Sequence, residues 1–598
     1  MAKTLTPIKY VSRDFDTIKS DLVQHVKRYY PETLKDFSEA SFGSIVLDTV
    51  SYVGDIMSFY LDYQANESFL NTAIEYENIV KIGKQLGYKF KGVPASVGLA
   101  HFYIVTPAND VGLGPDVDYL PILKRGSTFS SRNGVGFILD DDVRFDHPTN
   151  EIVAGKINSE TGVPTSYAVK ALGRVSSGNF VTEVITVGQH EKFKRIKLAN
   201  SGVTEILSVF DSNGNEYYEV DYLSQNVIYK DITNSRSSSK DDVPSILRPF
   251  MVARRFIVEN IGSTTYLQFG YGSEKELSAP PVVDPTDIAL SVHGRDHSTD
   301  SAFDPSKLLE TDKFGVPPSN TSLTIMYRIN NSRTTNASTG ALNRVVSPKF
   351  SYNNPLDISR ARANEVNSSL EIFNPEPVVG GVSNPSITEL KRRILDTFAT
   401  QNRAVTINDF VAMVYQMPPK FGAIKRASII RDPDSFKRNL NLYVLAENDV
   451  GKLIEPNSLL KENLKLWINR FKMIHDTIDI IDAKIINLGI RFKIMADPQS
   501  NKFDVLASAQ AVLRELFFEP SNIGENFYLT DVYTALNRVR GVIDTTNVEL
   551  FLRSGGEYST TIFNFDDAMS ADGRYLVCPK NVAFEIKYPS VDIEGSVI

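Results

Sequence analysis

The stretch SFGSIVLDTVSYVGDIMSFYLDY, Ser41–Tyr63, contains the longest apolar-looking run of the chain. Its apolar side chains recur at steps of three and four residues, which is the period of an α-helix. Asp48 and Asp55 interrupt the run, and they too stand at helical spacing. On a helix, these apolar side chains would form a wide stripe, which is typical of a helix that is buried among several other helices. We therefore predict that the segment from about Glu39 to Ala73 is a long amphipathic helix and its turn, buried in a bundle with other proteins.

Shorter helices are expected on both sides of this segment. Asp16–Tyr30 carries apolar residues on one helical face and stops at Pro31, which cannot continue a helix. Thr72–Leu86 ends at Gly87, because glycine readily takes the left-handed conformation that closes a helix. Together these segments form a predicted helical N-terminal head.

The pattern of apolar and polar residues changes after about residue 96. Period-two, β-branched runs such as GLAHFYIV and TTYLQFGYG alternate with glycine, asparagine and proline, which predicts a β-rich middle body. From residue 386 onward, helical and strand patterns alternate, as in compact α+β units of the split β-α-β type. The predicted fold class is therefore multidomain α+β. The predicted domains are a helical domain at 1–95, the β-rich body at 96–272, a polar, loop-rich insertion with short strands at 273–384, an α+β domain at 385–500 and a C-terminal α+β unit with a β tail at 501–598.

Bulk composition narrows the classes of function. A chain of 598 residues exceeds one hydrophobic core, so about three to five structural units are expected. The formal net charge of -8 disfavours a nucleic-acid partner, because the average surface repels phosphate. The single cysteine, Cys578, allows neither an intramolecular disulfide nor a cysteine zinc cluster. We expect neither a secretion signal nor membrane insertion, because there is no sufficiently long apolar segment.

No catalytic constellation can be assembled from the sequence. The close pair His293 and His297 lies in a loop-like HGRDHSTD, and we interpret it as solvated histidines rather than as a metal site. The acidic triple Asp140–Asp142 lacks the spacing of a calcium loop and is interpreted as a polar turn. We therefore expect no enzyme, no cofactor and no metal. An envelope-directed hydrolase remains a distant alternative, without residues to nominate.

The stretch from 386 to 417 predicts a helical hairpin. Ser386 with Glu389, and Thr406 with Asp409, have the spacing of capping boxes, in which each side chain satisfies an orphan backbone donor of the first turn. Arg403 lies in the turn between them, where last-turn carbonyls or a carboxylate would hold its guanidinium. We expect Arg403→Ala to weaken folding or assembly by about 1 to 3 kcal/mol.

A nucleic-acid module is the alternative interpretation of this hairpin. Basic residues flank it on both sides, as in a helix-turn-helix protein. The second helix, TINDFVAMVYQM, nevertheless carries Asp409 and no lysine or arginine that could reach a base edge, which favours a structural role. The basic residues are Lys391, Arg392, Arg393, Lys420, Lys425 and Arg426.

Five separated motifs occur in a fixed order along the chain. They are YLDYQANESFLNTA at 60–73, IGKQLGYKFKGVPAS at 82–96, YLPILKRGSTFSS at 119–131, TTYLQFGYGSE at 264–274 and RRILDTFATQNRAVTINDF at 392–410. Together they resemble one family, the baseplate J-like wedge proteins of contractile-tailed phages, and most closely the large inner-baseplate wedge subunit of T-even-type phages. The resemblance covers most of the chain between Phe15 and Arg553, although Ser127 replaces the usual threonine of its motif.

The resemblance implies a non-enzymatic subunit of the virion tail baseplate, assembled in the host cytoplasm. Such a subunit pairs with a second copy of itself and with other wedge proteins through helical bundles. Neighbouring wedges then join into a ring around the tail hub and relay baseplate movement to the sheath. A component of a phage-like injection particle, such as a secretion system or tailocin, is the alternative. The expected partner-binding residues are Ile45, Val46, Val50, Val53, Ile56, Met57, Tyr60, Leu61, Phe69 and Leu70.

Overall fold

The computed structural model describes residues 14–598 except 33–35, 39–40, 110–113, 161, 234–244, 263, 273–313, 331–334, 356–357 and 433–438. The chain divides into two compact units. Unit 1 comprises Met1–Lys89 and Asn384–Asn402, and unit 2 comprises Phe90–Ser383 and Arg403–Ile598. The predicted fold class is confirmed, with N-terminal helices, a β-rich body and C-terminal α+β units. His293 and His297 lie outside the described residues.

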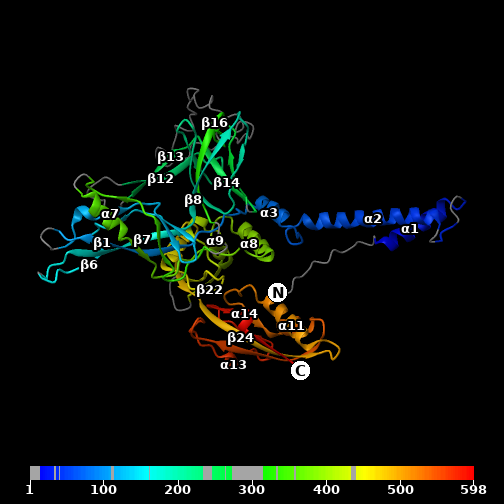
Figure 1. Cartoon of the computed structure of the whole chain (residues 1–598). Coiled ribbons are helices and arrows are strands. Elements are labelled where there is room, and N and C mark those ends of the chain that lie inside the picture. The colour runs from blue at the N-terminus through cyan, green and yellow to red at the C-terminus, as the bar shows by residue number, and fades with distance from the viewer. Residues whose placement is uncertain are drawn as a thin grey trace. The chain divides into compact units, whose positions relative to one another are not determined.

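Unit 1 is helical. Its longest helix, α2, begins after Ser41, whose hydroxyl accepts a hydrogen bond from the Ser44 amide at 3.1 Å and so caps the helix. Helix α1 lies alongside α2, both in blue (Figure 1). The helices are α1 (Phe15–Tyr29), α2 (Phe42–Glu67), α3 (Tyr76–Gln85) and α8 (Ile387–Thr400).

Helix α8 joins this unit from a distant part of the sequence. It contacts α3, and the Lys391 ammonium donates to the Asn71 carbonyl oxygen at 3.0 Å. The five-part division drawn from the sequence stays a prediction. Helix α8 was predicted to open the α+β domain at 385–500, whereas in the structure it groups with the N-terminal helices.

The first sheet of unit 2 has seven strands around a long antiparallel pair, β1 and β7. Its inner face is apolar, with Phe102, Phe129 and Phe137 fully buried in one core, and α7 (Arg360–Ser368) contacts β1. The strand order is β17 (Leu342–Ser347), β3 (Thr128–Ser131), β4 (Gly136–Leu139), β7 (Ser166–Ser177), β1 (Val97–Pro107) and β19 (Glu371–Phe373), with β6 (Glu151–Ala154) beside β7. A small sheet of β18 (Phe350–Ser351), β2 (Ile122–Leu123) and β5 (Val143–Arg144), with the 3-10 turn η1 (Val117–Tyr119), belongs to the same region.

The second sheet also has seven strands. Strand β16 comes from the region predicted to be a polar insertion, yet it lies between β8 and β10 with Leu323, Ile325 and Tyr327 fully buried. This part of the region therefore completes a core. The strand order is β8 (Asn179–Val187), β16 (Thr321–Ile329), β10 (Val203–Phe210), β11 (Glu216–Glu219), β14 (Arg255–Ile261), β15 (Thr264–Phe269) and β9 (Arg195–Lys197), with a separate hairpin of β12 (Val227–Thr233) and β13 (Ser245–Met251).

The first α+β region, which is part of unit 2, has a core formed by α9, α10 and the central strand β21. Strands β21 and β23 flank α10 in the chain and pair directly in parallel, so they form a β-α-β crossover. The Asn457 side-chain amide donates to the Val97 carbonyl oxygen of β1 at 2.6 Å. The elements are α9 (Ile407–Tyr415), η3 (Pro419–Phe421), β20 (Arg426–Arg431), β21 (Asn439–Glu447), β22 (Leu453–Ile454), α10 (Ser458–Ile468) and β23 (Thr477–Asp482).

The C-terminal α+β region, also part of unit 2, is built on the long strand β24 (Figure 1). Strand β26 pairs with it in antiparallel, and β28 and β29 pair with it in parallel on successive segments. The side chains of α11 and α12 close the apolar core. The elements are β24 (Lys484–Ala496), α11 (Lys502–Leu516), β25 (Phe527–Tyr528), α12 (Leu529–Asn537), β26 (Val542–Arg553), α13 (Phe565–Ala568), β27 (Tyr575–Leu576), β28 (Val582–Glu585), α14 (Pro589–Asp592) and β29 (Ile593–Val597).

Candidate functional site

One side of α2 faces α1 and carries several small residues. Ser44, Leu47 and Ser51 are buried there. A Cβ atom placed on Gly54 would lie 3.2 Å from the Ile18 side chain of α1, so the two helices approach closely at this point. An ion pair between Lys19 and Asp48, at 2.7 Å, lies on the same side. Helix α1 therefore covers the small-residue side of α2.

The wide apolar face of α2 is exposed. Of the ten residues predicted to bind a partner, eight are exposed, Ile56 is half-buried and Leu70 is buried. Three further exposed aromatic residues of α2, Phe42, Tyr52 and Phe59, were not among the predicted residues, although they belong to the same apolar run. A contiguous apolar face of this kind on a folded chain marks a surface for another protein. The exposed predicted residues are Ile45, Val46, Val50, Val53, Met57, Tyr60, Leu61 and Phe69.

The turn after α2 is organised by Glu67, a buried carboxylate. Its oxygens accept hydrogen bonds from the Ile74 amide at 2.7 Å, from the Glu75 amide at 3.3 Å and from the Asn78 side chain at 2.9 Å. The Ile74 and Glu75 amides stand immediately before α3, and Asn78 lies in its first turn. Leu70 is buried in the intervening turn, so the motif NESFLNTA encodes a helix-to-helix junction.

The electrostatics of this junction favour the ionised carboxylate. Burial acts to raise the pKa of Glu67, but the hydrogen bonds from Asn78, Ile74 and Glu75, with the nearby charge of Lys391, outweigh it and lower the pKa below its ordinary value. Burial in turn lowers the pKa of the Lys391 ammonium, and the charge of Glu67 opposes that shift. Glu67 was not among the predicted site residues, although it lies within the motif YLDYQANESFLNTA.

Of the two predicted capping boxes, the one at Thr406 and Asp409 is reciprocal, and at Ser386 the structure shows the hydrogen bond of the N-cap hydroxyl. The Thr406 hydroxyl accepts from the Asp409 amide at 3.3 Å, and the Asp409 carboxylate accepts from the Thr406 amide at 2.8 Å, which makes a reciprocal capping box. The Ser386 hydroxyl accepts from the Glu389 amide at 3.4 Å. The Glu389 carboxylate accepts from Arg393 at 2.6 Å, so it also pairs along the helix.

The predicted tie from Arg403 to the last turn of the preceding helix stays a prediction, because that helix, α8, belongs to unit 1 and Arg403 belongs to unit 2. Its side chain is exposed, and within its own unit no described carboxylate or carbonyl oxygen accepts a hydrogen bond from its guanidinium. The chain turns through two left-handed residues just before it, Gln401 with φ 48° and Asn402 with φ 60°. The turn conformation therefore comes from backbone geometry and from the Thr406 cap, and Arg403 does not tie it together within unit 2.

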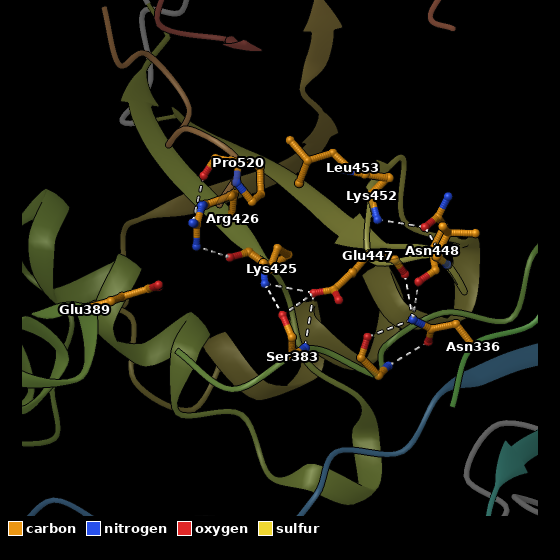
Figure 2. A network of polar contacts seen from close by, with 12 residues as sticks. Asn336, Ser383, Glu389, Lys425, Arg426, Glu447, Asn448, Lys452, Leu453 and Pro520 are labelled. Atoms are coloured by element: carbon orange, nitrogen blue, oxygen red, sulfur yellow. Dashed lines mark hydrogen bonds and ion pairs between the residues drawn. The ribbon is translucent and has the colours of Figure 1, made fainter. Parts of the chain in front are cut away.

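Three of the six basic residues that favoured a nucleic-acid site are engaged by groups of the protein itself. Lys425 forms a buried ion pair with Glu447 at 2.9 Å, and Arg426 donates to the Pro520 carbonyl oxygen at 2.9 Å (Figure 2). Arg393 pairs with Glu389 on α8. These three cations are consequently not available to bind phosphate groups.

The remaining candidates for metal binding or catalysis are the acidic triple Asp140–Asp142 and the single cysteine, Cys578. In the acidic triple, Asp142 accepts from Lys124 and from the Arg125 amide, whereas Asp140 accepts from Ser176, so the carboxylates do not converge. Burial raises the pKa of the Cys578 thiol to about 12, which keeps it protonated. Among the described residues, no group of three potential ligands is placed to hold a metal ion, and no helix combines the length and apolarity needed to cross a bilayer.

Comparison with known proteins adds one family. Residues 14–85 match the family described as bacteriophage baseplate protein, N-terminal domain. This range contains α1, α2 and α3, and therefore the exposed apolar face and the Glu67 junction. No curated protein matches the chain.

Two solved structures were also compared. A cryo-EM structure of the anti-feeding prophage (AFP) baseplate covers 94% of this chain and 90% of its own, with 9% identity and a TM-score of 0.25. The type VI secretion system TssK-TssF-TssG baseplate subcomplex covers 74% of this chain and 96% of its own, with 6% identity and a TM-score of 0.23. At TM-scores this low, neither carries an argument about this chain.

Proposed function

We propose that the chain is a structural, non-enzymatic baseplate subunit of a contractile phage tail, located in the virion. The observation that carries this proposal is the coincidence of two features in residues 14–85. These residues match the N-terminal domain of bacteriophage baseplate proteins, and they present the exposed apolar face of α2. A helix with a wide apolar face stabilises an assembly by packing into a bundle with other helices.

The occupants of the α2 face are a second copy of this chain and a further wedge protein. Small residues and α1 cover only one side of α2, which leaves its other side for added helices. Removing a Leu, Val or Met side chain from water contributes about 1.5 to 3 kcal/mol each. Seven of the eight exposed predicted residues lie on α2, and their burial would contribute a large part of the free energy that association requires. Wedges formed in this way join into a ring around the hub and pass baseplate movement on to the sheath.

The proposal is tested by measuring complex formation with matched variants. The wild-type chain, alone and co-expressed with proteins encoded beside it, is expected to give dimers or higher complexes by native mass spectrometry. Met57→Glu with Leu61→Glu should abolish these complexes while the chain stays folded. The control is Val184→Glu, which places a glutamate on an exposed apolar residue of β8. Its complexes should persist.

Two outcomes would contradict the proposal. One is a monomeric wild-type chain whose α2 amides are fully protected from hydrogen exchange, because the face would then need no partner. The other is loss of complexes in both the α2 variant and the β8 control, because the effect would then not belong to α2.

A further inference from the structure

The side of α2 that α1 leaves uncovered carries two rows of mainly apolar residues. In each row the positions alternate steps of four and three residues, which is the spacing of core positions in a coiled coil. The first row, the aliphatic seam, consists of Val46, Val50, Val53, Met57 and Tyr60. The second row, the aromatic seam, consists of Ile45, Thr49, Tyr52, Ile56, Phe59 and Tyr63. A helix with two such rows can pack against two added helices at once.

The aromatic seam is accessible in the folded chain. Tyr52 is 59% exposed and Phe59 is 38% exposed. The rings of Phe59 and Tyr63 stack with their centroids 6.3 Å apart, and the Tyr63 hydroxyl donates to the Glu75 carboxylate at 3.1 Å. These contacts hold the two rings in place, so the seam is already formed before a partner binds.

A column of aspartates flanks the aromatic seam. Asp48, Asp55 and Asp62 recur at intervals of seven residues, which places them on one side of the helix. Their neighbours three and four residues away include Tyr52 and Phe59, and residues at these spacings lie side by side on a helix. No residue of the aliphatic seam stands at either spacing from an aspartate. The three charges therefore lie beside the aromatic seam and not beside the aliphatic one.

Of these aspartates, Asp48 has an ion-pair partner in the folded chain, Lys19 of α1 at 2.7 Å. Asp55 and Asp62 are half-buried, and among the described residues no lysine or arginine forms an ion pair with either of them. Helix α2 contains no lysine or arginine of its own. A helix docked on the aromatic seam would bury these two carboxylates further, which is unfavourable unless that helix brings positive charge to them.

We propose that the aromatic seam binds a partner helix whose lysine or arginine side chains recur every seven residues and pair with Asp55 and Asp62. Flanking ion pairs of this kind determine partner choice and orientation in helical bundles. The α2 helix of a second copy cannot supply them, because it carries the same aspartates and no cation. The uncharged aliphatic seam is left for that copy. The inference rests on the proposed function, since it specifies the chemistry of the other protein that this face binds.

The test measures how two synthetic helical peptides bind to the full chain, by fluorescence anisotropy. The peptides share the same leucines at their core positions and differ only at the flanking positions, which carry lysine in one peptide and glutamate in the other. The wild-type chain should bind the lysine peptide about tenfold more tightly, because each exposed ion pair changes affinity by up to roughly fivefold. Salt should reduce this preference, because it screens exposed charges.

The decisive variant is Asp55→Lys with Asp62→Lys. It should bind the glutamate peptide more tightly than the lysine peptide, which inverts the preference of the wild type. Asp55→Asn with Asp62→Asn removes the charges with little change of shape, and it should bind the two peptides about equally. This second variant keeps the test decisive if the melting temperature shows that the charge-reversed chain does not fold.

The charge control is Glu365→Lys with Glu515→Lys. It makes the same change in net charge on two exposed acids, in α7 and α11, and it should keep the preference for lysine. The apolar variant is Tyr52→Ser with Phe59→Ser, which should weaken binding of the lysine peptide about tenfold or more because apolar surface is lost from the seam. Its control, Val184→Ser on β8, should not weaken that binding.

The proposal is overturned if the charge-reversed α2 keeps the wild-type preference, or if the charge control loses that preference equally. It is also overturned if Tyr52→Ser with Phe59→Ser removes a dimer of the chain in native mass spectrometry, because a second copy would then occupy the aromatic seam. The proposed function fails instead when Met57→Glu with Leu61→Glu leaves the complexes intact, so the two failures are distinguishable.

Discussion

The side-chain amide of Asn78, in the first turn of α3, donates a hydrogen bond at 2.9 Å to the carboxylate of Glu67, the last residue of α2. The same carboxylate accepts from the amides of Ile74 and Glu75, the two residues that precede α3. One buried acid therefore joins two helices and takes the place of a helix cap. These hydrogen bonds fix the orientation of α3 relative to α2, the helix that carries the apolar face.

We predict that Glu67→Ala loosens α3. The substitution leaves the Ile74 and Glu75 amides without their charged acceptor, which costs about 2 kcal/mol, or roughly thirtyfold in hydrogen-exchange protection. Protection factors of the α3 amides in the full chain measure the effect. The control is Glu77→Ala, an exposed acid on the same helix, which should change stability by less than about 0.5 kcal/mol. Equal effects of the two substitutions would contradict the role given to Glu67.

Acid should weaken the same junction. The pKa of Glu67 lies below its ordinary value of 4.5, because its hydrogen bonds outweigh the effect of burial. A carboxyl with a lowered pKa in the folded chain stabilises that chain above the pKa of the unfolded state, and the stabilisation is lost as the pH falls through the folded value. The protection of α3 should therefore be constant down to about pH 5 and decline below about pH 4.5. Glu67→Gln should remove this part of the dependence, and parallel curves for the two proteins would refute the assignment.

We predict that Gly54→Leu separates α1 from α2. A Cβ atom at this position already lies 3.2 Å from Ile18, so Gly54→Ala needs only a small shift and gains about 1 kcal/mol in helix propensity. Leucine adds further carbons at the contact and should cost about 1 to 3 kcal/mol. Exchange of the α1 amides should accelerate in Gly54→Leu alone. Val53→Leu, on the exposed side of the same turn, serves as the size control.

The turn before α9 should depend on Asp409 and not on Arg403. Asp409→Ala breaks the capping box with Thr406 and should cost about 1 to 2 kcal/mol. Arg403→Ala should change the free energy of unfolding by less than about 0.5 kcal/mol, because the guanidinium is exposed and no described oxygen of unit 2 accepts a hydrogen bond from it. The sequence alone predicts a larger loss, of about 1 to 3 kcal/mol. Thermal melts of both variants decide the matter, and similar destabilisation by the two would restore Arg403 as a structural tie.

Local signals predicted the local structure of this chain. The capping box at Thr406 and Asp409 depends on four consecutive residues, and the period of α2 is contained in its own sequence, so both could be inferred without tertiary information. The membership of α8 in unit 1 could not, because its contact from Lys391 to Asn71 spans 320 residues.

The burial of Lys425 and Arg426 also could not be predicted from the sequence. Lys425 and Arg426 have the composition of a surface patch, and only the folded chain brings Glu447 and the Pro520 carbonyl oxygen to them. Exposure of the α2 face is similarly a property of the whole fold. Its apolar period predicts burial against some other helix, but it does not specify whether that helix belongs to the same chain.

The discontinuity of unit 1 also bears on biosynthesis. A ribosome that has completed α3 must add about 300 further residues before α8 emerges to contact it. At about 5 to 20 residues per second, this interval lasts roughly 15 to 60 s. During that time the nascent α1–α2 hairpin already displays its apolar face, while the unit that carries it is incomplete. Newly made chains are thus exposed to premature association, and a chaperone or a waiting partner would serve them before translation ends.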